Sequence, residues 1–160
     1  MSYRHWTLPS AMVVAAATAL FAQSYTFSDS AGNFSVTAPG PMTGGNGEGW
    51  IAFSTKQDGV EYYVQYRDLA DISMGASALL DAIVNGVVNQ SGGNPTERRS
   101  IQLNRTYPGR YLVVEDSDTV HVFAVYLVND RLYGIGGNYR KGGDHRDQVD
   151  QFIDSFRLLN

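Results

Sequence analysis

The sequence predicts an α+β fold in which an antiparallel β-sheet of about seven to eight strands is flanked by two main helices. Three observations lead to this prediction. The chain has 160 residues, of which 43% are hydrophobic, and that suits one ordinary domain. Most apolar residues alternate with polar ones, whereas two segments change to helical spacing. The resulting order is four strands, a helix, four strands and a helix, with connections short enough for antiparallel pairing.

The first four predicted strands form two hairpins. Tyr25–Ser28 and Phe34–Thr37 alternate apolar and polar residues around a polar turn. The segment Pro39–Gly49 is rich in glycine and has almost no side chain to bury, so we predict a flexible loop there. Trp50–Thr55 and Val60–Arg67 then pair around an Asp-Gly turn.

Alternation within the fourth strand separates its tyrosines. Tyr62 and Tyr66 lie on one face, whereas Tyr63 shares the other face with Gln65 and Arg67. One of the two faces is therefore expected to point outward.

The first helix is predicted where apolar residues recur at helical spacing from Leu79 to Val88. Ser77 is the expected N-cap, and the segment Ser91–Pro95 ends the helix. An antiparallel meander follows, with Tyr107-Pro108-Gly109 as its first turn. Its four strands are predicted at Arg99–Leu103, Arg110–Glu115, Val120–Val128 and Arg131–Ile135.

The last helix has the sharpest apolar stripe in the chain. Asp144 is the expected N-cap, and the acidic residues that follow it are expected on the solvated face. The stripe that should pack on the sheet consists of Val149, Phe152, Ile153 and Phe156.

Residues 1–22 are predicted to be a bacterial signal peptide. Arg4 is their only formal charge, and an apolar run leads to small residues, with cleavage expected after Ala22 or Ser24. The alternative is an uncleaved N-terminal anchor, but the twelve-residue apolar run spans roughly 18 Å as a helix, short of the ~30 Å hydrocarbon core. We therefore expect a periplasmic or secreted domain over residues 23–160, with a membrane tether as the alternative.

Nearly all of this domain resembles the PsbP-like and Mog-type fold. That group contains the extrinsic P subunit of the photosynthetic oxygen-evolving complex, a Ran-binding transport factor and exported bacterial proteins of unassigned activity. The resemblance implies a PsbP-like α/β/α sandwich that docks onto a larger assembly, such as a photosynthetic complex, and does not turn over a substrate. It is carried by Gly32–Gly40, Val60–Asp68, Tyr107–Arg110, Val125–Tyr133 and Phe152–Leu158.

The amino-acid composition excludes several kinds of functional site. Without cysteine there is no disulfide, thiolate nucleophile, Cys-ligated zinc or iron–sulfur cluster. A net charge of −4 disfavours binding to nucleic acid. The glycine-rich segment Gly134–Gly143 fits no phosphate-loop spacing and is interpreted as a flexible connection. We predict no enzyme, and no catalytic, cofactor-binding or metal-binding residues.

Two histidines leave alternatives open. His121 lies on a strand face with Phe123 and is interpreted as a buried histidine with one partner; the alternative is the base of a hydrolase or of a metal-dependent enzyme. His145 stands among aspartates that suggest a cation site, although a solvated helix face is the preferred interpretation.

The favoured function is an exported, non-catalytic accessory domain that binds another protein, as a periplasm-facing subunit that stabilises a membrane complex. The alternative is a small-ligand carrier with a pocket between helix and sheet. The candidate partner-binding residues are Arg98, Arg99, Arg105, Arg110 and Tyr63.

Overall fold

The computed structural model describes residues 23–47, 49–70 and 72–159, which form ten strands and two helices. The expected leader, residues 1–22, lies outside the described residues. The elements are β1 (Tyr25–Asp29), β2 (Phe34–Ala38), β3 (Thr43–Gly47), β4 (Trp50–Gln57), β5 (Val60–Asp68), α1 (Ala76–Ser91), β6 (Asn94–Leu103), β7 (Tyr107–Glu115), β8 (Thr119–Val128), β9 (Arg131–Arg140), α2 (Arg146–Asp154) and β10 (Arg157–Leu158).

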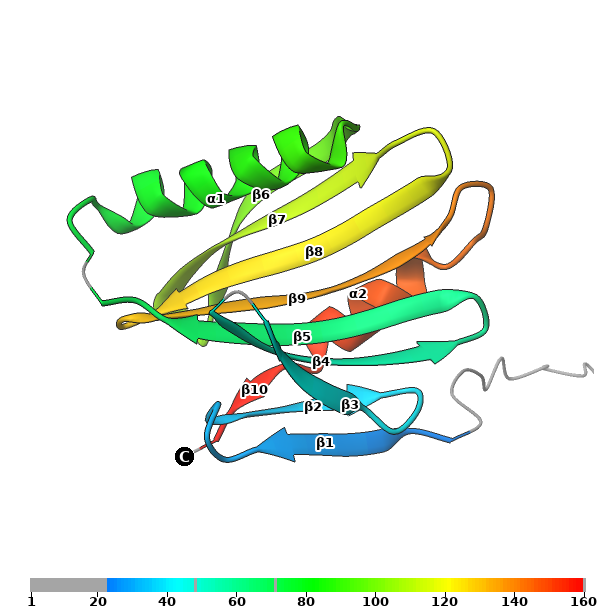
Figure 1. The fold of residues 1–160 in the computed structure, drawn as a ribbon, viewed down its shortest axis with the longest axis horizontal. Helices are drawn as coiled ribbons and strands as arrows, with labels where there is room; N and C mark the ends of the chain where they lie inside the picture. Colours follow the sequence, from blue (N-terminus) through cyan, green and yellow to red (C-terminus); the bar gives the residue numbers. More distant parts are fainter. Residues whose placement is uncertain (1–22, 48, 71, 160) are drawn as a thin grey trace, which may run out of the picture.

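Seven strands form one antiparallel sheet in the order β3-β4-β5-β9-β8-β7-β6, and β1, β2 and β10 form a small second sheet. Helix α1 lies on one face of the large sheet, whereas α2 and the small sheet lie on the other (Figure 1). The prediction of an α+β fold with two flanking helices is therefore confirmed. Neither helix within the described ranges has the length and apolarity needed to cross a bilayer.

Strand alternation divides the core into two layers. On the α2 side, the rings of Tyr62 and Phe152 meet edge to face, with centroids 5.4 Å apart. On the α1 side, Leu80 and Val84 of the helix are fully buried and pack in the same cluster as Leu112 of β7. Burial of these apolar surfaces on both sides of one sheet is the main stabilising contribution to the fold.

Strands occupy the middle of the first glycine-rich segment, as β3, and most of the second, as β9, so the predictions of flexible connections were wrong for these residues. Strand β3 pairs with β4 from Thr43↔Ser54 onward, and a Cβ on Gly44 would lie 2.6 Å from the Phe53 ring. Phe53 therefore occupies the space that a side chain on β3 would need. Likewise, β9 continues through its glycines to Arg140, because β5 and β8 pair with it on both sides.

The turn predicted at Tyr107-Pro108-Gly109 was also wrong, because these residues belong to β7. Thr106 N donates to Leu103 O at 3.1 Å, and the two residues between them, Asn104 and Arg105, have φ of 52° and 58°. Both central residues are thus left-handed, which a primed hairpin turn requires.

Neither predicted N-cap is correct. Helix α1 begins after Gly75, and the Ser77 hydroxyl accepts a hydrogen bond from Arg110 Nη2 at 2.7 Å. Helix α2 begins after His145, one residue later than expected, without a capping bond from that side chain. Tertiary contacts therefore replace local capping at the start of α1.

Candidate partner-binding site

Helix α1 covers only part of its side of the sheet. It lies over β7 and β8, and the same face of β4, β5 and β9 continues beyond it (Figure 1). Register places side chains of β4 beside those of β5 on this face, since Trp50 and Arg67 occupy adjacent positions and Ser54 is opposite Tyr63. We call this surface the open face, and it consists of Trp50, Ala52, Ser54, Tyr63, Gln65, Arg67, Gly134 and Gly136.

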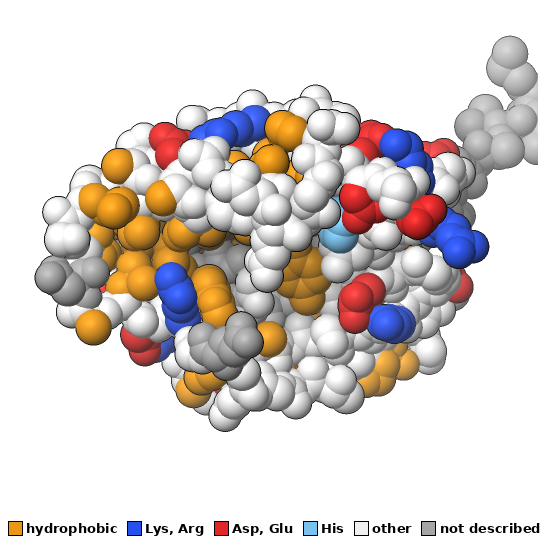
Figure 2. Space-filling model, turned by 45° about the horizontal axis from the view of Figure 1, so that its top comes forward, with side chains coloured by type: hydrophobic (Ala, Val, Ile, Leu, Met, Phe, Trp, Pro, Cys, Tyr) orange, Lys and Arg blue, Asp and Glu red, His pale blue; other side chains and the backbone are white. Residues whose placement is uncertain are grey.

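A hollow of about 200 Å³ lies between α1 and the open face. Aromatic side chains of Trp50, Tyr63 and Phe123 line it, and Ile83 and Val87 of the helix close one side. Figure 2 shows hydrophobic side chains gathered at the bottom of this recessed surface, beside charged groups. The hollow is therefore apolar at its centre and polar around its margin.

Two glycines of β9 form the floor of the open face. A Cβ on Gly136 would lie 2.3 Å from Val122 O and 2.8 Å from Tyr63 Oη. At Gly134, the nearest atom would be Gln65 Nε2, at 3.2 Å. The missing side chains allow Tyr63 and Gln65 to lie across the strand. Burial raises the pKa of Tyr63, and Glu61 adds to the effect, so its hydroxyl stays protonated as a hydrogen-bond donor.

Arg67 stacks on Trp50, one of the residues that line the hollow. Its guanidinium carbon is 4.8 Å from the centroid of the Trp50 ring, a cation–π arrangement. Its Nε atom is buried and has no hydrogen-bond partner among the described residues. Sequence alternation had placed Arg67 on the face of Tyr63, but it was not among the candidate partner-binding residues.

The five candidate residues do not form one surface. Arg98 and Arg110 both donate to Asp81 of α1, at 2.9 and 2.8 Å, and so attach the helix to the sheet. Arg99 points to the opposite face, where its guanidinium carbon lies 4.1 Å from the centroid of the Tyr111 ring. Arg105 is exposed in the β6–β7 turn, and Tyr63 alone lines the hollow. A role of the four arginines in partner binding stays a prediction.

His121 is half-buried and has two partners, so the interpretation of one partner was wrong. Nδ1 lies 3.0 Å from Asn138 Oδ1, and Nε2 lies 3.0 Å from Asp116 Oδ2. The hydrogen bond from His121, together with backbone N–H groups of Asp118 and Thr119, lowers the pKa of Asp116 to about 2. Because both ring nitrogens are engaged, neither faces a hydroxyl that it would deprotonate.

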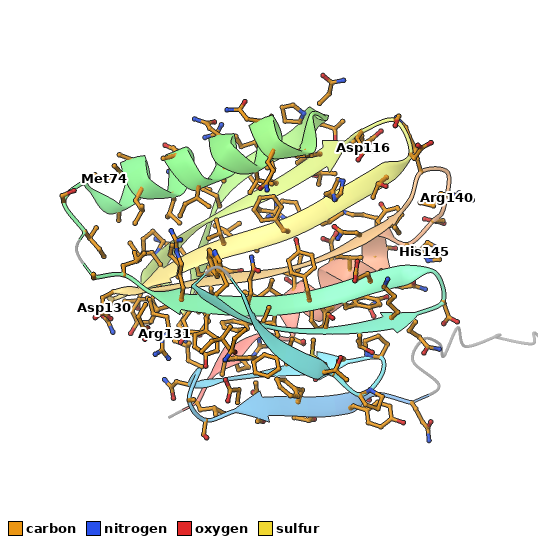
Figure 3. The ribbon with its side chains drawn as sticks, viewed as in Figure 1. Met74, Asp116, Asp130, Arg131, Arg140 and His145 are labelled. Atoms are coloured by element: carbon orange, nitrogen blue, oxygen red, sulfur yellow. The ribbon has the colours of Figure 1, made fainter. Side chains whose placement is uncertain are left out.

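Figure 3 separates the ends of the molecule. Asp116 and His145 lie at one end, and Asp130 and Arg131 lie at the other. His145 Nδ1 is 2.9 Å from Gln148 Oε1, and its ring packs edge-on against Tyr139. In the described part of the chain, no three His, Asp or Glu side chains are grouped so that they could hold a metal ion.

No family model matches the sequence, and no curated protein matches it. Among solved structures, the solution structure of cyanobacterial PsbP (CyanoP) from Synechocystis sp. PCC 6803 is similar, with 15% sequence identity and a TM-score of 0.59. The alignment covers 95% of this chain and 99% of that chain. Similarity at this level of identity concerns the fold and not the activity. The chain therefore has the PsbP-like α+β fold.

Proposed function

We propose that this protein is an exported, non-catalytic accessory domain that binds another protein through its open face, as a subunit of a membrane assembly. The observation that carries the proposal is the aromatic hollow formed by Trp50, Tyr63 and Phe123 beside a helix that covers only part of its sheet face. Aromatic residues in a partly desolvated pocket are the side chains that contribute most at protein interfaces.

The size of the hollow favours protein docking over the carrier alternative. Its volume is about 200 Å³, whereas sites for drug-sized ligands measure roughly 300–1,000 Å³. A hollow of this size suits a side chain presented by a partner better than a whole small molecule.

The contacts of His121 favour a structural role for this histidine over an enzymatic one. Asp116 and Asn138 engage both imidazole nitrogens, and Asp116 also accepts bonds from the β7–β8 turn at 2.8 and 2.7 Å. This arrangement ties the turn to β9. A general base needs a nitrogen that reaches the proton to be removed.

Export rests on the composition of residues 1–22, which we propose are removed as a signal peptide from a periplasmic or secreted protein. The intact mass of the mature protein distinguishes this from a retained anchor. A mass that matches a chain starting near residue 23 supports cleavage, whereas the mass of the full-length chain contradicts it.

Co-purification from gently solubilised membranes tests the docking proposal. Ser54→Arg places a long charged side chain beside Tyr63 on the open face, and Gln151→Arg places the same side chain on the exposed surface of α2. We expect Ser54→Arg to abolish a stoichiometric complex and Gln151→Arg to retain it, with equal melting temperatures. A strictly monomeric wild-type protein, or equal complex formation by both variants, would contradict the proposal.

A further inference from the structure

One arginine on the open face, Arg67, has no ion pair with the residues that the structure describes. Arg67 Nε is buried, yet it has neither a hydrogen bond nor an ion pair among the described residues. Arg105, Arg140 and Arg157 also lack ion pairs with described residues, but all three are exposed, so water solvates them. A buried donor without a partner destabilises the free protein. Arg67 as a whole is only half-buried, and Nε is the only one of its nitrogens that is buried without a partner, so a carboxylate of a bound partner can reach the rest of the guanidinium.

The surroundings of Arg67 define what kind of anion fits. Arg131 holds Asp68 in a two-pronged ion pair and lies over the Tyr66 ring on the opposite face of the sheet, and Lys56 pairs with Glu61 at 3.6 Å at the other end of β5, so neither cation is beside Arg67. One unneutralised guanidinium matches a single carboxylate in a planar, two-bond arrangement. A phosphate dianion would need a second cation, which these residues do not supply.

We propose that the partner contributes a segment with one Asp or Glu whose carboxylate binds Arg67, and a neighbouring apolar side chain that fills the hollow between Trp50, Tyr63 and Phe123. This inference rests on the proposed docking function. The chain carries a net charge of −4, so a long acidic run would be repelled. The expected segment therefore has an isolated carboxylate among apolar residues.

Selection of random heptapeptides displayed on phage against the full chain tests the inference. The chain has two tryptophans, so in a Trp6→Phe variant the fluorescence of Trp50 alone reports occupation of the hollow. We expect enriched peptides to contain Asp or Glu next to an apolar residue. Replacing that carboxylate by its amide should weaken binding at least about tenfold, as loss of a charge-assisted hydrogen bond predicts.

Three variants separate recognition from structure. Arg67→Met removes the guanidinium and retains an apolar stem, and we expect binding of the acidic peptide to weaken at least about tenfold. Its melting temperature should change little, because removal of the unpartnered buried donor offsets loss of the cation–π contact with Trp50. Arg67→Lys should bind the acidic peptide with intermediate affinity, since lysine retains the positive charge but cannot form the planar, two-bond arrangement of a guanidinium. The exposed control, Arg105→Gln, should bind as the wild type does.

Several results would overturn the inference. These are equal binding of the acidic peptide to Arg67→Met and to the wild type, or quenching of Trp50 by octanoate or inorganic phosphate that is as strong as quenching by the peptide. The enriched peptides could instead be neutral and fail to bind only the Ser54→Arg variant. The proposal of an acidic segment is then wrong, and the proposal of docking on the open face stands. If no peptide is enriched, or if enriched peptides bind Ser54→Arg normally, both proposals fail.

Discussion

Tyr62 and Tyr63 are neighbours in the chain and lie on opposite faces of the same sheet. Tyr62 is 1% exposed beneath α2, where Phe152 packs against its ring. Tyr63 lines a hollow that α1 covers only in part. Both faces carry aromatic residues, so composition does not distinguish them. The difference is the covering layer: α2 and the small sheet close one face, and a single helix leaves the other partly open (Figure 1).

The largest expected effect comes from truncating side chains on the sheet face that α2 and the small sheet cover. Tyr62→Ala and Phe152→Ala should each lower the free energy of unfolding by about 3–5 kcal/mol, because each leaves a cavity in a fully covered core. Tyr63→Ala should cost clearly less, since its ring borders the open hollow. Chemical denaturation of the three variants provides the measurement. Equal losses would mean that the two faces do not differ in coverage.

The floor of the open face provides a matched pair of variants. Gly136→Ala should destabilise by about 1–3 kcal/mol, because its Cβ would meet the backbone carbonyl of Val122 and force a shift. Gly134→Ala should be tolerated better, since its Cβ would meet only the flexible Gln65 side chain. Thermal unfolding compares the two, and the reverse order would contradict the described packing on β9.

The pH dependence of stability sharpens the interpretation of His121 as structural. The pKa of Asp116 is lowered from 3.8 to about 2 in the folded protein. The ionised carboxylate therefore stabilises the fold above pH 3.8, and this contribution is lost as the pH falls through about 2. The stability difference between wild type and Asp116→Asn should shrink over that window. A difference that is constant with pH would argue against this ion pair.

The smallest effect is expected at the β6–β7 turn. Arg105 has a φ of 58°, and glycine adopts this conformation without strain. Arg105→Gly should therefore raise the free energy of unfolding by about 0.5–1 kcal/mol, with no change in partner binding. Denaturant titration measures the first effect. A loss of binding would instead restore Arg105 as a partner contact.

Alternation in the sequence was sufficient to place Tyr63 and Arg67 on one face. Periodicity predicted both helices and eight of the ten strands, but it missed β3 and the short β10. The features that the sequence did not predict depend on contacts between segments that are far apart in the chain. Gly44 and Gly109 pair with the neighbouring strands in β3 and β7, and both positions need glycine because a Cβ would lie 2.6 Å from the ring of Phe53 or of Tyr126. In isolation both glycines resemble turn residues. Similarly, no local pattern shows that Asp81 draws Arg98 and Arg110 away from a basic surface.

The central claim is that the open face is the surface that a partner covers. Photo-crosslinking in cells that produce the protein tests it directly, with benzoylphenylalanine introduced at Ser54 on the open face or at Gln151 on α2. The account predicts one crosslinked partner from position 54, attached through a peptide with an isolated Asp or Glu, and its loss in Arg67→Met. Equal crosslinking from position 151 would contradict the claim, whereas an adduct that persists in Arg67→Met would contradict only the acidic contact to Arg67.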